Sequence, residues 1–413
     1  MLAKQIIPGE IKSVAVIGAG TMGGGIAMCF ANAGFNVILL EMNQNNLSKG
    51  ISAIAKRYDQ AHARGIINKQ KVNQCMALIT GTCNYQDLSQ VDLVVEAAFE
   101  TMEVKQQIFS QLDNVCKPDA ILASNTSYLD INEIAESTKR PEKVVGMHFF
   151  SPANIMKLLE VVATSFTDAQ TLTTAMALGK KMGKISVAVK VCYGFVGNRM
   201  YACYGREANM LLLEGATPEQ VDNAMVKWGM AMGPLAVNDM SGIDIGYKAR
   251  QANTDRPDDP CYFAAADMLV EAGRLGQKTH AGFYHYDTET NKRSPDDIAN
   301  NLIKDHATKL GVKQRESITD EEVQQRLIFA LINEGAYILE QNIASRASDI
   351  DAIWLNGYGF PRYLGGPMCY ADEIGLENVV ATIKKFQHQA GNTYWKVAPL
   401  LEQLVAQGKK FTN

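Results

Sequence analysis

Three glycines and an acid near the start of the chain have the types and spacing of a dinucleotide site. The segment SVAVIGAGTMGGGIA places Gly18, Gly20 and Gly23 between an apolar run and a helical pattern, and a second apolar run ends on Glu41. Gly18 permits a tight turn, Gly20 lets a ligand approach the backbone, and Gly23 lets the helix pack closely on a sheet. The free N–H groups at the start of that helix attract anions, so we expect them to bind a pyrophosphate.

The acid at the end of the second run indicates which dinucleotide fits. Glu41 would accept hydrogen bonds from an adenosine ribose and would repel a 2′-phosphate. The residues that follow, 42–46, include no arginine to hold such a phosphate. We therefore expect NAD rather than NADP, bound by Glu41 and by the turn with its residues Thr21 and Met22. The alternative is a tight turn that packs a helix on a strand and binds no ligand.

A histidine and a second acid could supply acid–base chemistry beside this cofactor. Transfer of a hydride from an alcohol to NAD needs a base for the hydroxyl proton, and histidine titrates near neutrality. Of the six histidines, only His148 ends an apolar run of the N-terminal region, and Glu160 follows in the apolar run KLLEVV. A carboxylate there is costly unless paired, and a pair with His148 would fix the ring tautomer and stabilise the imidazolium. The spacing leaves open a core histidine bonded to a backbone carbonyl, with Glu160 bonded to a lysine or a helix end.

Length, charge and cysteine content restrict the class of protein. A chain of 413 residues with 47% hydrophobic residues suggests about two to three globular domains. The net charge is −4, so nucleic acid and anionic membrane surfaces are not expected as main partners, and no apolar stretch has membrane-spanning length. The eight cysteines are scattered without a CxxC pair, which predicts reduced thiols and a cytoplasmic protein. The chain begins without a signal-peptide core, its end KKFTN is not a peroxisomal address, and no cluster with metal-ligand spacing predicts a metal.

Short apolar runs alternate with helical patterns from residue 13 to about residue 190. This alternation predicts an α/β fold with a mainly parallel, doubly wound sheet of the Rossmann type. The expected later strands are 93–100, 120–127, 144–150, 157–162 and 185–190, and the expected helices lie near 44–65, 103–113, 130–137 and 168–182. Ligands bind outside the carboxyl ends of such strands, so Glu100, Asn125, Ser127 and His148 are expected to converge near the cofactor.

After residue 190 the pattern becomes helical. Helices are expected at 194–216, at 218–228, from 235 to about 250, and near 296–310. Four residues of this region recur later at a nearly constant offset: Arg199, Glu207, Asp222 and Asp239 align with Arg326, Glu334, Asp351 and Asp372. The recurrence predicts two tandem copies of one all-helical domain. The expected organisation is an NAD-binding domain at 1–190, a first helical domain at 191–290, a linker at 291–319 and a second helical copy at 320–413.

Longer motifs, in order along nearly the whole chain, carry a resemblance to a known family. GAGTMGGGIA, SNTSYL, GMHFFSPANIMKLLEVV, GFVGNRM and GQKTHAGFYHY resemble segments of the L-3-hydroxyacyl-CoA dehydrogenases of fatty-acid β-oxidation. The likeness is greatest to the dehydrogenase half of the multifunctional β-oxidation enzymes, whose C-terminal helical domain is doubled. No enoyl-CoA hydratase region precedes residue 13, so the chain resembles the dehydrogenase part alone. The resemblance implies NAD-dependent oxidation of (S)-3-hydroxyacyl-CoA to 3-ketoacyl-CoA.

The resemblance also implies roles for single residues. His148 and Glu160 match the family's catalytic pair, and Ser127 and Asn198 match its other catalytic residues, which would bond to substrate oxygens or lie beside the nicotinamide. The second helical copy has Gln325 in place of Asn198, which indicates one active site per chain and a structural second copy. The residues that match cofactor-side positions are Ala98, Glu100, Lys105, Asn125 and Lys278.

Each of these roles has an ordinary alternative. Ser127 and Asn198 would serve equally as local caps of strand and helix ends. Glu100, Lys105 and Lys278 would be unremarkable as solvated surface charges. Family members often have an asparagine after HFF where this chain has the shorter Ser151, so a cofactor contact at that position is not carried over.

The sequence leaves two alternative functions possible and does not settle the oligomeric state or the partners. A β-hydroxyacid dehydrogenase for small free acids combines a Rossmann domain with helices but uses a lysine as base, and a crystallin-like relative needs the fold without the catalytic pair. The second helical copy would cover the surface through which two-domain relatives dimerise, which predicts a monomer or a weak homodimer. A separate hydratase or thiolase is a candidate partner, and the preferred acyl chain length is not readable.

Overall fold

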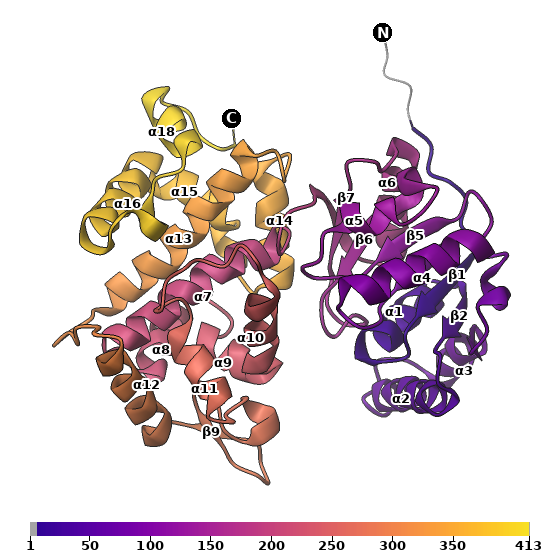
Figure 1. Cartoon of the computed structure of the whole chain (residues 1–413), viewed down its shortest axis with the longest axis horizontal. Helices are drawn as coiled ribbons and strands as arrows, with labels where there is room; N and C mark the ends of the chain where they lie inside the picture. Colours follow the sequence, from indigo (N-terminus) through magenta and orange to yellow (C-terminus); the bar gives the residue numbers. More distant parts are fainter. Residues whose placement is uncertain (1–5, 413) are drawn as a thin grey trace. The chain divides into compact units, whose positions relative to one another are not determined.

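The chain forms two compact units in the computed structural model, which describes residues 6–412 except for the side chain of Asn392 (Figure 1). The first unit runs to Val196 and also includes Asn342–Ser345, and the second comprises Gly197–Gln341 and the chain from Arg346 onward. The second unit contains both expected helical copies. The first five residues of the expected domain 1–190 and the last residue of the expected copy 320–413 lie outside the described residues.

The first unit is built on an eight-stranded sheet with the order β3-β2-β1-β4-β5-β6-β7-β8. Its strands are β1 (Ser13–Ile17), β2 (Asn36–Leu40), β3 (Ile79–Thr82), β4 (Leu93–Glu96), β5 (Ile121–Ser124), β6 (Val144–Phe149), β7 (Leu158–Ala163) and β8 (Ile185–Lys190). All neighbouring strands pair in parallel except β6 and β7, which are antiparallel. The Rossmann-type sheet expected from the alternation of patterns is therefore confirmed. Strand β3 and the antiparallel pair were not expected.

Helices connect these strands and bury their apolar faces on the sheet. They are α1 (Thr21–Asn32), α2 (Gln44–Ala63), α3 (Lys69–Ala77), α4 (Met102–Val115), α5 (Ile131–Glu136) and α6 (Ala169–Lys181). Helix α1 is buried over most of its length, and its Ile26 and Phe30 belong to the same apolar core as Val14 and Val16 of β1. The glycine-rich start of α1 makes this close approach to the sheet sterically feasible.

Two expected strands are shorter than predicted, and one expected helix is divided. The run 93–100 is a strand only to Glu96, and the run 120–127 is a strand only to Ser124. The residues beyond them leave the sheet and form loops at its carboxyl edge. The helix expected from residue 235 ends at Gly242, whose φ of +95° does not occur in a right-handed helix. It is followed by a second helix, so that α9 (Pro234–Ser241) and α10 (Ile243–Ala252) replace one element.

The second unit is helical, and its two longest helices lie side by side (Figure 1). Its remaining helices are α7 (Gly197–Glu214), α8 (Pro218–Trp228), α11 (Ala264–Glu271), α12 (Asp297–Lys309), α13 (Asp320–Glu340), α14 (Ala347–Gly357), α15 (Pro367–Ile374), α16 (Leu376–Ala390), α17 (Asn392–Trp395) and α18 (Pro399–Ala406). Helix α7 opens the first expected copy and α13 opens the second. Helix α12 is the one expected near 296–310.

Two ion pairs between α7 and α13 repeat the same contact in both directions. Arg199 Nε lies 2.6 Å from Glu334 Oε1, and Arg326 Nε lies 2.9 Å from Glu207 Oε2. Arg326 is the sequence counterpart of Arg199, and Glu334 is that of Glu207, so each copy gives an arginine to the other copy's glutamate. This reciprocity is the contact pattern of a two-fold homodimer, formed here within a single chain.

Two buried aspartates also recur in the copies, but their surroundings differ. The Asp222 carboxylate accepts backbone N–H groups at the start of α9, and Asp351 does the same at the start of α15. The Tyr284 hydroxyl also donates to Asp222, at 2.7 Å. Among the described residues, Asp351 receives no such hydroxyl. Burial and, to a smaller extent, the neighbouring Asp372 raise the pKa of Asp351 to about 7, although the backbone N–H donors act to lower it.

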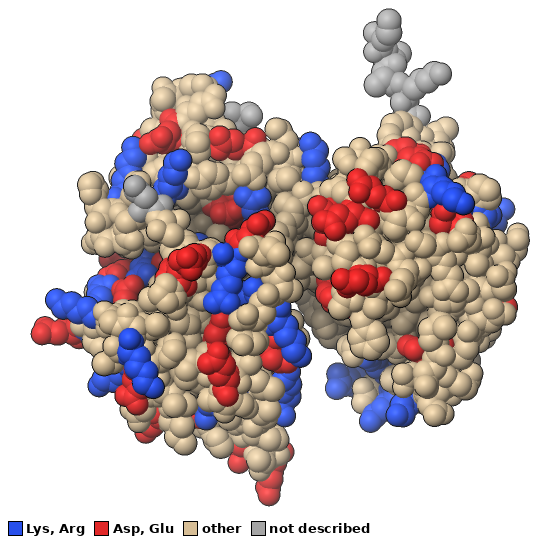
Figure 2. Space-filling model, viewed as in Figure 1, with Lys and Arg blue, Asp and Glu red and all other residues tan. Residues whose placement is uncertain are grey.

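Charges of both signs are intermingled on the helical unit over the face drawn in Figure 2. This distribution agrees with the small net charge of −4. Over residues 6–412, none of the helices is both long and apolar enough to span a bilayer.

The raised pKa of Asp351 predicts that the protein loses stability as the pH rises. An unfolded aspartate ionises near pH 4, whereas the folded one keeps its proton to about pH 7. The folded state therefore binds the extra proton between these values, and its stability falls as the pH rises through this range. We expect Asp351→Asn to reduce the drop in melting temperature between pH 5 and pH 8 by a few degrees, on the order of 1–2 kcal/mol.

Calorimetry at the two pH values measures this effect. The matched control is Asp305→Asn, which removes an exposed carboxylate from α12 and should leave the pH dependence as it is. An Asp351→Asn protein with the same pH dependence as the unchanged chain would contradict the assignment.

Candidate active site

The glycine-rich turn after β1 leaves open the space that a ligand would need. Gly18 has a φ of +95°, and a side chain on Gly23 would begin 1.8 Å from the Gly18 carbonyl oxygen, so both positions require glycine. Gly20 is different, because a Cβ there would meet no atom within 4 Å. Gly20 is also the N-terminal cap residue of α1 and supplies no side-chain cap. The turn is thus an uncovered helix N-terminus of the kind that binds a pyrophosphate.

Glu41 lies directly beside this turn. One oxygen of its carboxylate accepts the N–H of Ala19 at 3.2 Å, and the backbone N–H of Gly18 donates to Leu40 O at 2.8 Å. These bonds tie the end of β2 to the turn after β1, so that the Glu41 carboxylate and the glycines lie next to each other. Of the other predicted turn residues, Thr21 begins α1, and Met22 is half-buried against the core.

His148 and Glu160 face each other across the antiparallel strands β6 and β7. They are register partners, and His148 Nδ1 lies 2.7 Å from Glu160 Oε2. Glu160 is fully buried and His148 is 4% exposed. The other carboxylate oxygen accepts the N–H of Val196 at 3.2 Å, and the rings of Phe150 and Phe195 lie 4.5 and 5.5 Å from the imidazole.

This geometry assigns the two ring nitrogens different tasks. A buried carboxylate accepts hydrogen bonds, so the proton on the ring sits on Nδ1 and is directed at Glu160. Nε2 then carries the lone pair, and it has no hydrogen-bond partner among the described residues. The imidazole can therefore take a proton at Nε2, while the fixed carboxylate stabilises the cation that forms.

A buried ion pair lies under the carboxyl ends of β4 and β5. Lys105 Nζ lies 2.9 Å from both oxygens of Glu96, and the two side chains are 1% and 0% exposed. The Ser124 hydroxyl donates to Glu96 at 2.7 Å, and Lys105 also lies 3.2 Å from Glu100. Lys105 is thus enclosed by carboxylates rather than exposed as a surface charge. Glu96 was not singled out in the sequence, although an acid that ends an apolar strand is a signal for it.

Glu100 organises the loop that carries Ser127. One oxygen of Glu100 accepts the N–H of Ser127 at 2.8 Å and the hydroxyl of Thr126 at 2.5 Å. Asn125, just before them, accepts the N–H of Phe149 on its side-chain oxygen at 2.8 Å. These bonds connect the carboxyl ends of β4, β5 and β6. Thr126 was not predicted, because a buried threonine after a strand has no distinctive pattern.

Ala98, another predicted cofactor residue, belongs to the same network. Its N–H donates to Glu96 at 2.7 Å. One edge of the sheet therefore brings together five of the predicted residues: Ala98, Glu100, Lys105, Asn125 and Ser127. The carboxyl ends of β1 and β6 lie at the same edge. The predicted residues His148, Gly18 and Gly20 are at these two strand ends.

The last two predicted site residues belong to the helical unit. Asn198 lies in the first turn of α7, and its Oδ1 accepts the hydroxyl of Tyr358 at 2.8 Å. Lys278 lies in a short 3₁₀ helix (Gln277–Thr279) and forms an ion pair with Asp244. Ser151, where no cofactor contact is carried over, is exposed in the loop after β6.

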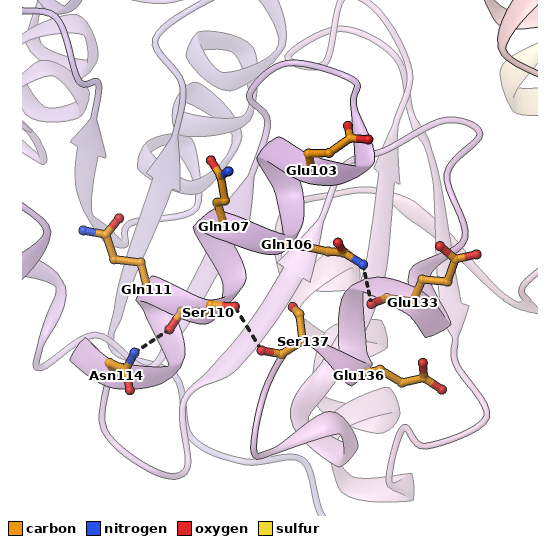
Figure 3. A pocket seen from close by; sticks show the side chains of 9 residues that line it. All are labelled: Glu103, Gln106, Gln107, Ser110, Gln111, Asn114, Glu133, Glu136 and Ser137. Carbon is orange, nitrogen blue, oxygen red and sulfur yellow. Dashed lines mark hydrogen bonds between the residues drawn. The ribbon is translucent and has the colours of Figure 1, made fainter.

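A separate polar groove lies between α4 and α5 on the outside of the sheet unit (Figure 3). Gln106 and Ser110 bridge the two helices by donating to the carbonyl oxygens of Glu133 and Ser137. The carboxylates of this groove belong to Glu103, Glu133 and Glu136, which are all exposed. Among residues 6–412, no group of His, Cys, Asp and Glu side chains could hold a metal ion.

The glycine geometry predicts opposite effects for two neighbouring substitutions. Gly20→Ala should keep the melting temperature but weaken NAD binding at least ~10-fold, because its methyl enters only the open space over the turn. Gly23→Ala should lower stability by roughly 1–3 kcal/mol or more, because the clash is with a backbone oxygen. Gly24→Ala is the control, since its Cβ would make an ordinary 3.4 Å contact. Isothermal and scanning calorimetry measure both quantities, and unchanged NAD affinity in Gly20→Ala would contradict the pyrophosphate assignment.

The buried pair predicts a rescue by a second substitution. Lys105→Met leaves the Glu96 carboxylate buried without a cation and should cost about 3–5 kcal/mol of stability. Adding Glu96→Gln removes the stranded charge and should recover much of the loss. Lys117→Met, at a partly exposed ion pair with Asp92, should cost about 1 kcal/mol or less. Thermal unfolding of the four proteins checks this, and a double variant no more stable than Lys105→Met would refute it.

Family models match both parts of the chain. The model of the 3-hydroxyacyl-CoA dehydrogenase NAD-binding domain matches residues 13–192, and that of the C-terminal domain of the same enzymes matches residues 194–286 and again 323–412. The NAD-binding match supports NAD as the cofactor, in agreement with the open turn at Gly20 and the acid at Glu41.

Relatives and solved structures agree with these matches. The chain is 44% identical to the peroxisomal bifunctional enzyme of Danio rerio over 97% of this chain and 57% of that protein, and 40% identical to the Homo sapiens protein of that name over 92% and 54%. The chain thus spans little more than half the length of these relatives. The 3-hydroxybutyryl-CoA dehydrogenase of Escherichia coli K12 superposes with a TM-score of 0.84 at 26% identity, covering 97% of this chain and all of that one.

A third structure matches nearly the same extent. The dehydrogenase part of multifunctional enzyme 1 from C. elegans has a TM-score of 0.69 at 30% identity, over 96% of this chain and 90% of that one. With two domain models that cover most of its length in the expected order, this chain belongs to the 3-hydroxyacyl-CoA dehydrogenase family, a family of NAD-dependent oxidoreductases.

Proposed function

We propose that this protein oxidises (S)-3-hydroxyacyl-CoA to 3-ketoacyl-CoA in fatty-acid β-oxidation, with His148 as general base and Glu160 orienting it. The observation that carries the proposal is the 2.7 Å contact between His148 Nδ1 and a fully buried Glu160. It occurs at the sheet edge where the nucleotide turn also lies. Family membership makes a 3-hydroxyacyl thioester the substrate class to test first.

The chain's own groups supply the acid–base part of the reaction. Nε2 of His148 takes the proton of the substrate's C3 hydroxyl, and Glu160 stabilises the resulting imidazolium through Nδ1–H. The Val196 N–H holds the second carboxylate oxygen, so the acid does not rotate away from the ring. The chemistry that bound NAD would supply is an acceptor for the hydride of C3. The NAD pyrophosphate would bind at Gly18, Gly20 and Gly23.

Four further residues have proposed roles that rest on their match to family positions. Ser127 would bond to the substrate's 3-oxygen or lie near the nicotinamide, and Asn198 would donate from its amide to that oxygen or to the thioester carbonyl. Lys278 would approach the cofactor. Glu100 would contact the nicotinamide ribose. Because Lys105 is buried against Glu96 and Glu100, we propose that it acts on the cofactor only by holding Glu100.

Two alternatives give different outcomes in one experiment. A β-hydroxyacid dehydrogenase would oxidise free 3-hydroxybutyrate, and a crystallin-like protein would oxidise neither the acid nor its thioester. We expect NADH formation with 3-hydroxybutyryl-CoA and none with 3-hydroxybutyrate. A series of thioesters from four to sixteen carbons then gives the chain-length preference.

We also propose how the protein exists in the cell. The internal two-fold contact between α7 and α13 favours a monomer or a weak homodimer, which sedimentation tests.

A separate hydratase or thiolase is the proposed partner. All eight cysteines are free, which agrees with a cytoplasmic location, and the peroxisome of the named relatives is the alternative that a fluorescent fusion would reveal.

Replacing the proposed base should lower turnover strongly without affecting the nucleotide site. His148→Gln should lower kcat by about 10²–10⁴-fold, because loss of a positioned general base has this effect. NAD affinity should remain within a factor of about two, since the glycine turn is intact. His388→Gln, on the exposed side of α16, is the matched control and should be fully active. Steady-state NADH formation measures the effect, and near-normal turnover in His148→Gln would reject the mechanism.

A further inference from the structure

The second helical copy donates a hydrogen bond to the one proposed substrate residue of the first copy. Tyr358 directly follows α14, and its hydroxyl donates to Asn198 Oδ1 at 2.8 Å. The two residues are 160 positions apart in the chain. Both are half-buried, so the amide is neither enclosed in the core nor fully solvated.

The ring of Tyr358 is held firmly enough to fix this bond. It stacks on Trp354 with ring centroids 4.7 Å apart and an interplanar angle of 26°, and its centroid lies 5.6 Å from that of Tyr201. Trp354 is fully buried. A Cβ on Gly197 would lie 2.6 Å from the Tyr358 hydroxyl oxygen, so the start of α7 can approach the ring only because residue 197 is glycine.

The internal repeat shows that this bond is not a requirement of the packing. Helices α8 and α14 are counterparts, and the residue after α8 is Gly229, where α14 is followed by Tyr358. The counterpart of Asn198 is Gln325, whose amide donates to Glu321 one turn earlier on its own helix. The repeat-related contact, between α13 and α8, thus forms without a tyrosine hydroxyl after α8 and without an asparagine at the place of Asn198. Both departures from the repeat occur together, at the one end of the pair that carries the proposed substrate residue.

We propose that Tyr358 is a positioning residue for the dehydrogenase reaction, acting through Asn198. This inference rests on the proposed function. A tyrosine hydroxyl that donates to Oδ1 fixes the orientation of the Asn198 side-chain amide, with Oδ1 toward the tyrosine. The Nδ2 hydrogens are then directed away from the tyrosine. In that orientation the amide is ready to donate to an oxygen of the substrate, the role proposed for Asn198. The second helical copy therefore contributes to the active site rather than serving only as a structural cover.

A double-mutant cycle tests the proposal. Tyr358→Phe keeps the ring and its stacking and removes the hydroxyl. We expect kcat with 3-hydroxybutyryl-CoA to fall about 3- to 30-fold, while KM for NAD stays unchanged, because one hydrogen bond to a neutral amide is lost. In an Asn198→Ala background the same change should have no further effect, since the group it positions is gone.

Controls separate positioning from general stability. Tyr337→Phe removes a hydroxyl that donates to backbone carbonyls near residue 396 in the same unit and should leave kcat unchanged. The melting temperature of Tyr358→Phe should remain within a few degrees of the unchanged protein. An unchanged kcat in Tyr358→Phe, or an equal loss in the presence and absence of Asn198, would overturn the proposal.

A spectroscopic measurement keeps the test independent of turnover. The side-chain amide of Asn198 can be identified in ¹⁵N-labelled protein as the signal that Asn198→Ala removes. We expect Tyr358→Phe to shift and broaden it and to speed its hydrogen exchange, while Tyr337→Phe does not. An unaffected signal would overturn the proposal. If the unchanged protein fails to oxidise the thioester, the proposed function has failed, and this signal still decides whether Tyr358 holds the amide.

Discussion

The pairing of β6 with β7 in opposite directions is the constraint on which the proposed chemistry depends. It sets His148 directly opposite Glu160, with both side chains removed from water. A buried carboxylate is costly unless its oxygens are satisfied, and here an imidazole and a backbone N–H share that task. The same hydrogen bond that satisfies the buried carboxylate of Glu160 also fixes the orientation of the imidazole ring.

The sheet edge around this pair is organised by a second set of buried charges. Glu96 and Lys105 compensate each other in the interior, and Lys105 also holds Glu100. Glu100 in turn accepts from the loop that carries Ser127. The contacts between Glu96 and Lys105 are strengthened by the low dielectric of their surroundings and would be expensive to leave unmade, whereas Glu100 is exposed and joins this interior pair to the loop. The loop that carries Ser127 is therefore tied, through the exposed Glu100, to an ion pair that water does not reach.

The two copies of the helical domain obey a two-fold relation in some contacts and depart from it in others. The reciprocal pairs of Arg199 with Glu334 and of Arg326 with Glu207 keep the contact of a two-fold dimer. Tyr358 and Asn198 depart from it, because Gly229 follows α8 where Tyr358 follows α14, and Gln325 stands at the place of Asn198. Within one chain the two copies are free to diverge, whereas identical subunits must carry every substitution twice. This freedom explains how one copy can specialise in supporting a residue of the other.

The sequence by itself determined the features that local spacing encodes. The glycines before α1, the acid after β2 and the alternation that forms the sheet depend on neighbours within a few tens of residues. The recurrence of the helical domain is visible when the chain is aligned with itself at a nearly constant offset. The direction of β7 was also within reach, because the eight residues between β6 and β7 are too few for the crossover that a parallel pair needs. Likewise, Glu96 was visible as an acid at the end of an apolar strand.

Only the tertiary structure decided which side chains meet across long distances. The enclosure of Lys105 by two carboxylates and the bond from Tyr358 to Asn198 depend on close packing between elements, which no periodicity records. Spacing in the chain reports which face of an element a residue occupies. The partner on the opposite face is set by the register and approach of a second element, and these follow from the packing of the core as a whole.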